Sequence, residues 1–176
     1  MALEIERKFL LRGDGWRAGV SASSEMRQGY LNQEARASVR VRREVSESGE
    51  VLAFLNIKSA TVGAVRHEYE YAIPESDAVH LLESLCAGPL VEKRRYQVPF
   101  GQHVWEIDEF FGDNAGLMVA EVELGAEDEA FLRPDWLGQE VTGDVRFYNT
   151  CLSRHPFSAW REDERQAVLA AAAASQ

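Results

Sequence analysis

Cysteine is scarce in this chain. Only Cys86 and Cys151 occur among its 176 residues, and they do not stand at the spacing of metal ligands. This argues against a cysteine-based metal site. We expect both cysteines to pack as ordinary side chains in a reducing compartment.

Positive charge is also in short supply. The chain has 19 lysines and arginines against 29 aspartates and glutamates, which gives a net charge of −10. This balance argues against a protein that binds nucleic acid through a broad basic surface, so we expect no nucleic-acid partner. It leaves room for a small concave site that concentrates positive charge.

Long apolar runs are missing as well. No segment approaches the roughly 20 residues that a membrane span needs. Charged residues begin at Glu4 and no signal peptide is visible, so we expect a cytoplasmic protein without a membrane partner. The chain is long enough to bury a core, and no repeat or linker divides it. We therefore expect a single domain over residues 1–176.

The chain is rich in charges at alternate positions, beginning with "LEIERKFL" at residues 3–10. Successive side chains of a β-strand point to opposite faces, so Glu4, Glu6 and Lys8 share one face of such a strand. Further strands are expected at 25–31, 37–45, 51–59, 64–73, 90–100, 103–111 and 117–124. The spacing predicts helices over 76–86 and 127–132, and a helical tail from residue 145 with a break near Pro156. This order predicts an α+β protein on a closed or nearly closed antiparallel sheet.

Charged or polar pairs at positions i and i+2 recur on most of these strands. They are Arg40 and Arg42, Asn56 and Lys58, Glu68 and Glu70, Lys93 and Arg95, Glu106 and Asp108, and Glu121 and Glu123. In a sandwich such pairs would face water, whereas in a barrel with a polar lumen they would converge inside. Two features favour the lumen: the signs are segregated strand by strand, and the apolar faces of the helices need a sheet exterior to cover.

The same alternation sorts the neighbouring charges. Arg7, Arg43 and Arg94 fall on the opposite face from the pairs, so we exclude them from a site. Arg66 either extends a basic row on the face of Glu68 and Glu70 or forms an ion pair outside, and the place of Glu106 in the lumen is equally open.

A lumen that holds both the acidic pairs and the basic pairs has a specific chemistry. Closely packed carboxylates cannot all stay ionised without a cation, and oxygen ligands suit Mg²⁺ or Mn²⁺. Clustered arginine and lysine need an anion, and the planar guanidinium matches phosphate oxygens. The combination predicts a polyphosphate substrate that carries a divalent metal.

An ordered set of motifs is similar to a known family. "EIERKF" resembles the Glu-x-Glu-x-Lys signature of the CYTH domain proteins, also called triphosphate tunnel metalloenzymes, and the charged pairs above follow in the family's order. The tail "EVTGDVRFYN" (140–149) resembles the segment after the last barrel strand, with Arg146 as its basic residue. The chain departs from the family at Val145 and Tyr148, where several relatives carry lysine. Its length is similar to that of the short bacterial members.

The resemblance implies an eight-stranded antiparallel barrel that forms a tunnel, with flanking helices and a helical C-terminus. It implies phosphate binding by Lys8, Arg40, Arg42, Lys58, Lys93, Arg95 and Arg146. It implies metal binding by Glu4, Glu6, Glu68, Glu70, Asp108, Glu121 and Glu123. Among these, Lys8, Glu6 and Glu123 are the expected catalytic residues.

Family members hydrolyse tripolyphosphate, hydrolyse thiamine or nucleoside triphosphates, or cyclise ATP. We expect Mg²⁺- or Mn²⁺-dependent hydrolysis of tripolyphosphate to pyrophosphate and phosphate. A class IV-type adenylyl cyclase, a thiamine or nucleoside triphosphatase, and a polyphosphate- or nucleotide-binding module without turnover are the alternatives. The triphosphate substrate is the one small-molecule partner expected. The sequence leaves open whether the protein forms a homodimer.

Overall fold

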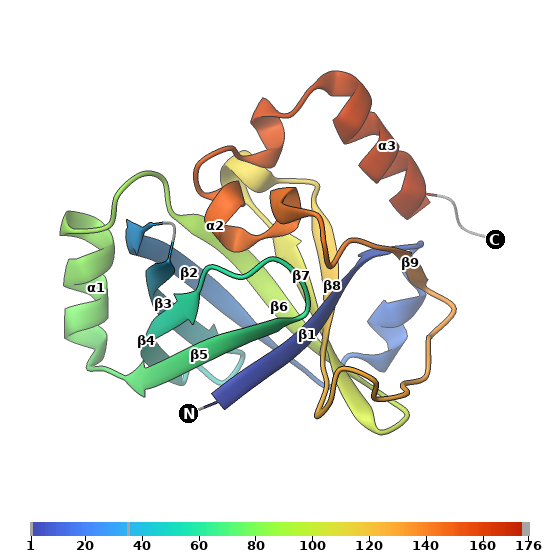
Figure 1. Ribbon diagram of the computed structural model, residues 1–176, viewed down its shortest axis with the longest axis horizontal. Helices are drawn as coiled ribbons and strands as arrows, with labels where there is room; N and C mark the ends of the chain where they lie inside the picture. Colours follow the sequence, from blue (N-terminus) through green and yellow to red (C-terminus); the bar gives the residue numbers. More distant parts are fainter. Residues whose placement is uncertain (1, 35, 174–176) are drawn as a thin grey trace.

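The structure is a computed structural model that describes residues 2–34 and 36–173 (Figure 1). Its strands are β1 (Ala2–Leu11), β2 (Ala22–Gln33), β3 (Ala37–Ser46), β4 (Val51–Ser59), β5 (Val65–Ala72), β6 (Val91–Phe100), β7 (His103–Phe110), β8 (Met118–Glu123) and β9 (Leu137–Glu140). Its α-helices are α1 (Glu75–Ser84), α2 (Asn149–Leu152) and α3 (Glu162–Ala173). Among these residues, no helix has the length and apolar character needed to cross a membrane.

The first eight strands form a closed antiparallel barrel. Hydrogen-bonded neighbours follow the order β5, β4, β3, β2, β6, β7, β8 and β1, and β5 also pairs with β1, which closes the ring. The register at the closure sets Glu4 opposite Arg66. β9 lies outside the ring and pairs with β1. The predicted eight-stranded barrel with flanking helices and a helical C-terminus is confirmed.

Helix α1 covers the outside of β3 and β4. Ala78 and Leu82 pack against Val41 and Ala53, and all four side chains are buried. Leu82 alone stabilises this contact by roughly 1.5–3 kcal/mol through the apolar area it removes from water. The apolar helix face therefore does meet the exterior of the sheet, as the sequence predicted. The helix begins one residue earlier than expected, at Glu75 after Pro74, and Ser76 does not cap it.

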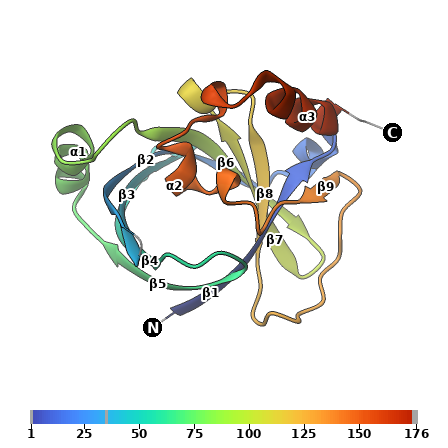
Figure 2. The ribbon, with the colours of Figure 1, turned by 45° about the horizontal axis from the view of Figure 1, so that its top comes forward.

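The inward-facing rows change character along the barrel. Beyond the charged positions of β1, β6, β7 and β8 they continue as apolar side chains: Leu10, Val91, Phe110 and Val119. These pack against aromatic and apolar residues of the C-terminal segment, which are Phe147, Leu152, Phe157 and Trp160. Figure 2 shows α2 lying across this end of the barrel. One end of the lumen is thus covered by the chain's own tail.

The helix predicted over 127–132 is wrong. The segment holds a turn at residues 127–128 and is otherwise irregular. Phe131 packs edge-on against Phe9 and Trp105, and the Glu129 carboxylate accepts the backbone N–H of Gly125. These contacts hold the backbone in an irregular conformation, and a regular helix would not preserve them.

Candidate active site

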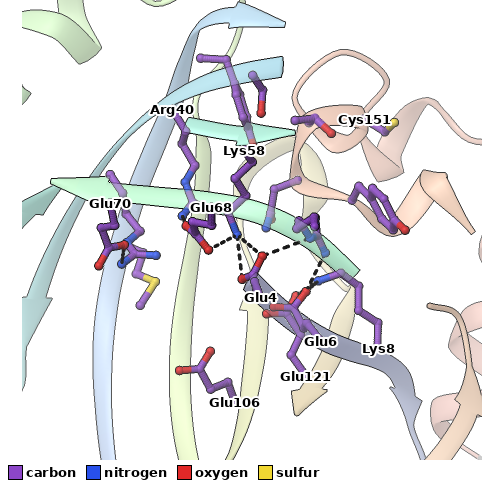
Figure 3. A pocket seen from close by; sticks show the side chains of 18 of the residues that line it. Glu4, Glu6, Lys8, Arg40, Lys58, Glu68, Glu70, Glu106, Glu121 and Cys151 are labelled. Carbon is purple, nitrogen blue, oxygen red and sulfur yellow. Dashed lines mark hydrogen bonds and ion pairs between the residues drawn. The ribbon is translucent and has the colours of Figure 1, made fainter. Parts of the chain in front are cut away.

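A charged cavity of about 600 Å³ lies inside the barrel (Figure 3). Its wall takes charged side chains from seven strands: Glu4, Glu6, Lys8, Arg40, Arg42, Glu44, Lys58, Arg66, Glu68, Glu70, Arg95, Glu106, Glu121 and Glu123. The eighth strand, β2, contributes Ser24, Met26 and Tyr30. The alternating charges therefore face inward, and the sandwich with charged outer faces is not the fold of this chain.

Lys8 lies between carboxylates of β1 and β8. Its ammonium is 2.5 Å from Glu6 Oε1 and also pairs with Glu121. Burial alone would lower the pKa of Lys8, but the carboxylates of Glu121 and Glu6 outweigh it and raise the pKa above its usual value. Lys8 is consequently a fixed positive charge and a hydrogen-bond donor.

The adjacent wall is built by β5, which pairs with β1, and by β4. Lys58 Nζ lies 2.9 Å from Glu4 Oε1 and 3.0 Å from Glu68 Oε2. The buried Asn56 amide donates to Glu68 and Glu70 at 2.8 and 2.6 Å. Figure 3 shows Lys58 reaching towards Glu4 and Glu68 from the neighbouring strands. The predicted pair of β4 thus organises the predicted acidic pair of β5.

Arg66 is inside the cavity. Its Nε lies 3.1 Å from Glu4 Oε2, and its Nη2 donates to Glu6 Oε1 at 3.1 Å. Burial opposes the charge, yet Glu6 and Glu4 raise the pKa of Arg66. The sequence left this residue open between the lumen and an exterior ion pair, and the structure places it in the lumen. Glu106, also left open, lines the cavity and pairs with Arg95.

Lys93 and Asp108 share the inward face of Arg95 but do not line the cavity, because they lie deeper in the barrel, towards Phe110. Lys93 Nζ is 2.5 Å from Asp108 Oδ2, and both side chains are buried. Arg95 donates to both oxygens of Asp108 at 2.7 Å and to Glu121 at 2.7 Å. Asp108 is thus already surrounded by cations, and its visible effect is to hold Arg95 in place. Burial, and then the charge of Arg95, lower the pKa of Lys93 to about 8.

Arg146 lies outside the cavity. It is exposed on the 3-10 helix Val145–Phe147 and pairs with Asp144 and with Glu164 of α3. Phe147 is buried in the cluster that covers the barrel end, which leaves the preceding side chain pointing outward. The structure therefore does not bring this predicted phosphate-binding residue to the others.

Several residues that line the cavity lie outside the alternating charged pairs of the strands. Tyr148 and the α2 residues Asn149, Thr150 and Cys151 line the cavity, as does Arg154 beyond them. Tyr30 of β2 is buried, and burial raises its pKa to about 12, so its hydroxyl stays protonated. Alternation within strands predicts only strand residues; the family resemblance pointed to the segment 140–149, but to its basic residue Arg146 and not to Tyr148 or Asn149.

The carboxylates of the cavity fit a hard divalent cation. Glu6 stands directly opposite Glu123 across β1 and β8, and Glu106 stands opposite Glu121 across β7 and β8. Like charges in such positions repel each other. Burial and the carboxylates of Glu4, Glu106, Glu6 and Glu68 raise the pKa of Glu123.

Among the described residues, no three side chains of the metal-binding types form a ready-made cage. Mg²⁺ commonly takes one or two carboxylates and completes its shell with water and substrate phosphate. The paired glutamates supply that number of ligands.

The chain matches the CYTH domain family over residues 2–148. It is 42% identical over 162 residues to a protein of Acetivibrio thermocellus named inorganic triphosphatase, covering 92% of this chain and 100% of that protein. It is 37% identical over 155 residues to an inorganic triphosphatase of Nitrosomonas europaea, covering 85% and 96%. A crystal structure of the inorganic triphosphatase NE1496 is similar, with a TM-score of 0.57, 34% identity and coverage of 85% and 96%.

Proposed function

This chain belongs to the CYTH domain family, and from that premise we propose that it hydrolyses inorganic tripolyphosphate to pyrophosphate and phosphate with a divalent metal. The observation that carries the proposal is one cavity lined by arginine and lysine side chains together with glutamate side chains. A metal-bound triphosphate satisfies both kinds of side chain at once. The relatives named inorganic triphosphatase, which align over nearly their whole length, support the same substrate.

Cations of the cavity would bind the phosphate oxygens. Arg40, Arg42, Lys58, Arg66 and Arg95 reach the cavity from four different strands. Guanidinium groups match phosphate oxygens in pairs and stabilise the charge that spreads over a transferred phosphoryl group. We assign no substrate contact to Lys93 or Arg146, because neither lines the cavity.

Glu4, Glu6 and Glu123 would hold the cation, with Glu68 and Glu121 linked to Glu4 and Glu6 through Lys58 and Lys8. When bound, Mg²⁺ or Mn²⁺ neutralises phosphate oxygens and lowers the pKa of a bound water. Glu123 is accessible to solvent, so it is placed to orient the attacking water. Lys8, with its raised pKa, would act as a donor that orients oxygen atoms and not as a base.

A substrate panel tests this function. The protein is assayed with tripolyphosphate, ATP and thiamine triphosphate, each with Mg²⁺, with Mn²⁺ and with chelator. We expect tripolyphosphate to give the highest kcat/KM, equal amounts of phosphate and pyrophosphate, and no turnover in chelator. Tight tripolyphosphate binding without any release of phosphate would instead identify a binding module, and cyclic AMP formed from ATP would identify a cyclase.

A further inference from the structure

Tyr148 joins two parts of the cavity wall that are far apart in sequence. It follows the 3-10 helix Val145–Phe147, is only 8% exposed, and lines the cavity. The segment 60–64 between β4 and β5 lies against it. The ring and the hydroxyl of this tyrosine make different contacts, which allows their effects to be separated.

The hydroxyl links the tail to the segment 60–64. It donates to the carbonyl of Thr142 at 2.8 Å and accepts the backbone N–H of Gly63 at 3.0 Å. Gly63 has a φ of +116°, a backbone conformation that residues other than glycine rarely adopt. Ala60 and Thr61 of the same segment line the cavity. The hydroxyl therefore holds a part of the cavity rim in place.

The ring lies beside two cations of the site. Arg66 Cζ is 5.3 Å from the ring centroid and Lys8 Nζ is 6.0 Å from it. Cations within about 6 Å of an aromatic face are attracted to it, and more strongly when both are withdrawn from water. Arg66 and Lys8 both contact the same carboxylate oxygen of Glu6, Oε1.

We propose that Tyr148 is a positioning residue for the reaction. Its ring fixes Arg66 and Lys8, and through them Glu4 and Glu6, while its hydroxyl keeps the segment 60–64 against the cavity. The ring governs turnover and the hydroxyl governs substrate affinity. This inference rests on the proposed hydrolysis of tripolyphosphate by the same cavity.

Two substitutions separate the ring from the hydroxyl. Tyr148→Phe keeps the ring, and we expect kcat within twofold of the wild type and KM raised about fivefold, the scale of one lost hydrogen bond. Tyr148→Leu removes both, and we expect kcat to fall about tenfold in addition. Tyr71→Leu, at an exposed position of β5, is the matched control and should change neither constant.

The variants are first checked for folding by circular dichroism and assayed well below their melting temperatures. Folded Tyr148→Leu protein with wild-type kcat would overturn the role of the ring, and equal loss of kcat in both variants would do the same. Wild-type KM in Tyr148→Phe would overturn the role of the hydroxyl.

Calorimetric titration with inorganic tripolyphosphate in chelator tests the positioning without turnover. Both variants should bind at least fivefold more weakly than the wild type, and unchanged binding would contradict the proposal. Wild-type protein that binds tripolyphosphate but never cleaves it would end the proposed function. The titration would then still decide whether Tyr148 positions the cations.

Discussion

Glu6 of β1 lies directly opposite Glu123 of β8, in register across two hydrogen-bonded strands. Facing carboxylates destabilise a sheet by up to about 1 kcal/mol. Glu6 is balanced by Lys8 and Arg66. The pKa of Glu123 is raised by burial and by neighbouring carboxylates. A cation bound between these two carboxylates would remove their repulsion.

Glu123→Gln should separate activity from stability. We expect turnover of tripolyphosphate to fall at least tenfold, the scale of losing a contact that supports a metal ion. In chelator the melting temperature should stay the same or rise by a few degrees, because one repulsion is removed. Parallel measurement of kcat and thermal unfolding checks both. An active variant, or one that is inactive only because it unfolds, would contradict the role given to Glu123.

Arg66→Ala and Arg146→Ala test the placement of two arginines that sequence reasoning treated differently. Arg66 lies in the cavity beside Glu4 and Glu6, whereas Arg146 is exposed and pairs with Asp144. Loss of a hydrogen bond to a charged group changes a binding or rate constant by about 10- to 150-fold. Arg66→Ala should therefore lower kcat/KM for tripolyphosphate by about that factor.

Arg146→Ala should leave kcat/KM within twofold, since exposed ion pairs contribute little. The reverse order of effects, with Arg146→Ala the more damaging, would restore the family-based assignment of Arg146 and refute the placement of Arg66.

Lys93 gives stability a defined dependence on pH. Its pKa is lowered to about 8, mainly by burial and then by Arg95, from an ordinary value of 10.5. Between these values the unfolded chain binds more protons than the folded one, so this residue makes stability rise with pH from about 8 to 10.5. Lys93→Met removes the group, while Asp108 keeps its two hydrogen bonds from Arg95.

Urea unfolding of wild type and Lys93→Met in chelator, at several pH values, measures this contribution. The wild type should gain unfolding free energy relative to the variant across that pH range. A difference that stays constant with pH would show that Lys93 titrates at its ordinary value.

Alternation predicted the face of each strand residue well, because a side chain can change face only if the register slips. Glu4, Glu6, Arg40 and Arg42 all reach the lumen as their spacing indicated. Alternation does not predict depth. Lys93 shares the face of Arg95 but lies where the row passes into the apolar end of the barrel, beside Phe110.

The parts that the sequence did not predict depend on contacts between distant segments. β9 pairs with β1, and Glu140 at its end pairs with Arg7. Tyr148 enters the wall because Phe147 and Leu152 anchor the tail on the barrel end. Neither arrangement leaves a periodic signal. The predicted single domain over residues 1–176 and the homodimer stay predictions.

The most direct test compares Arg42→Ala with Arg43→Ala, two neighbours on β3 that face opposite ways. Arg42 lines the cavity beside Glu44 and Glu70, and Arg43 pairs with Glu75 of α1 on the outside. The measurement is kcat/KM for tripolyphosphate with Mg²⁺, on variants shown to be folded. A cavity that binds the phosphates predicts a loss of at least about tenfold for Arg42→Ala and less than twofold for Arg43→Ala. Equal effects of the two substitutions would contradict it.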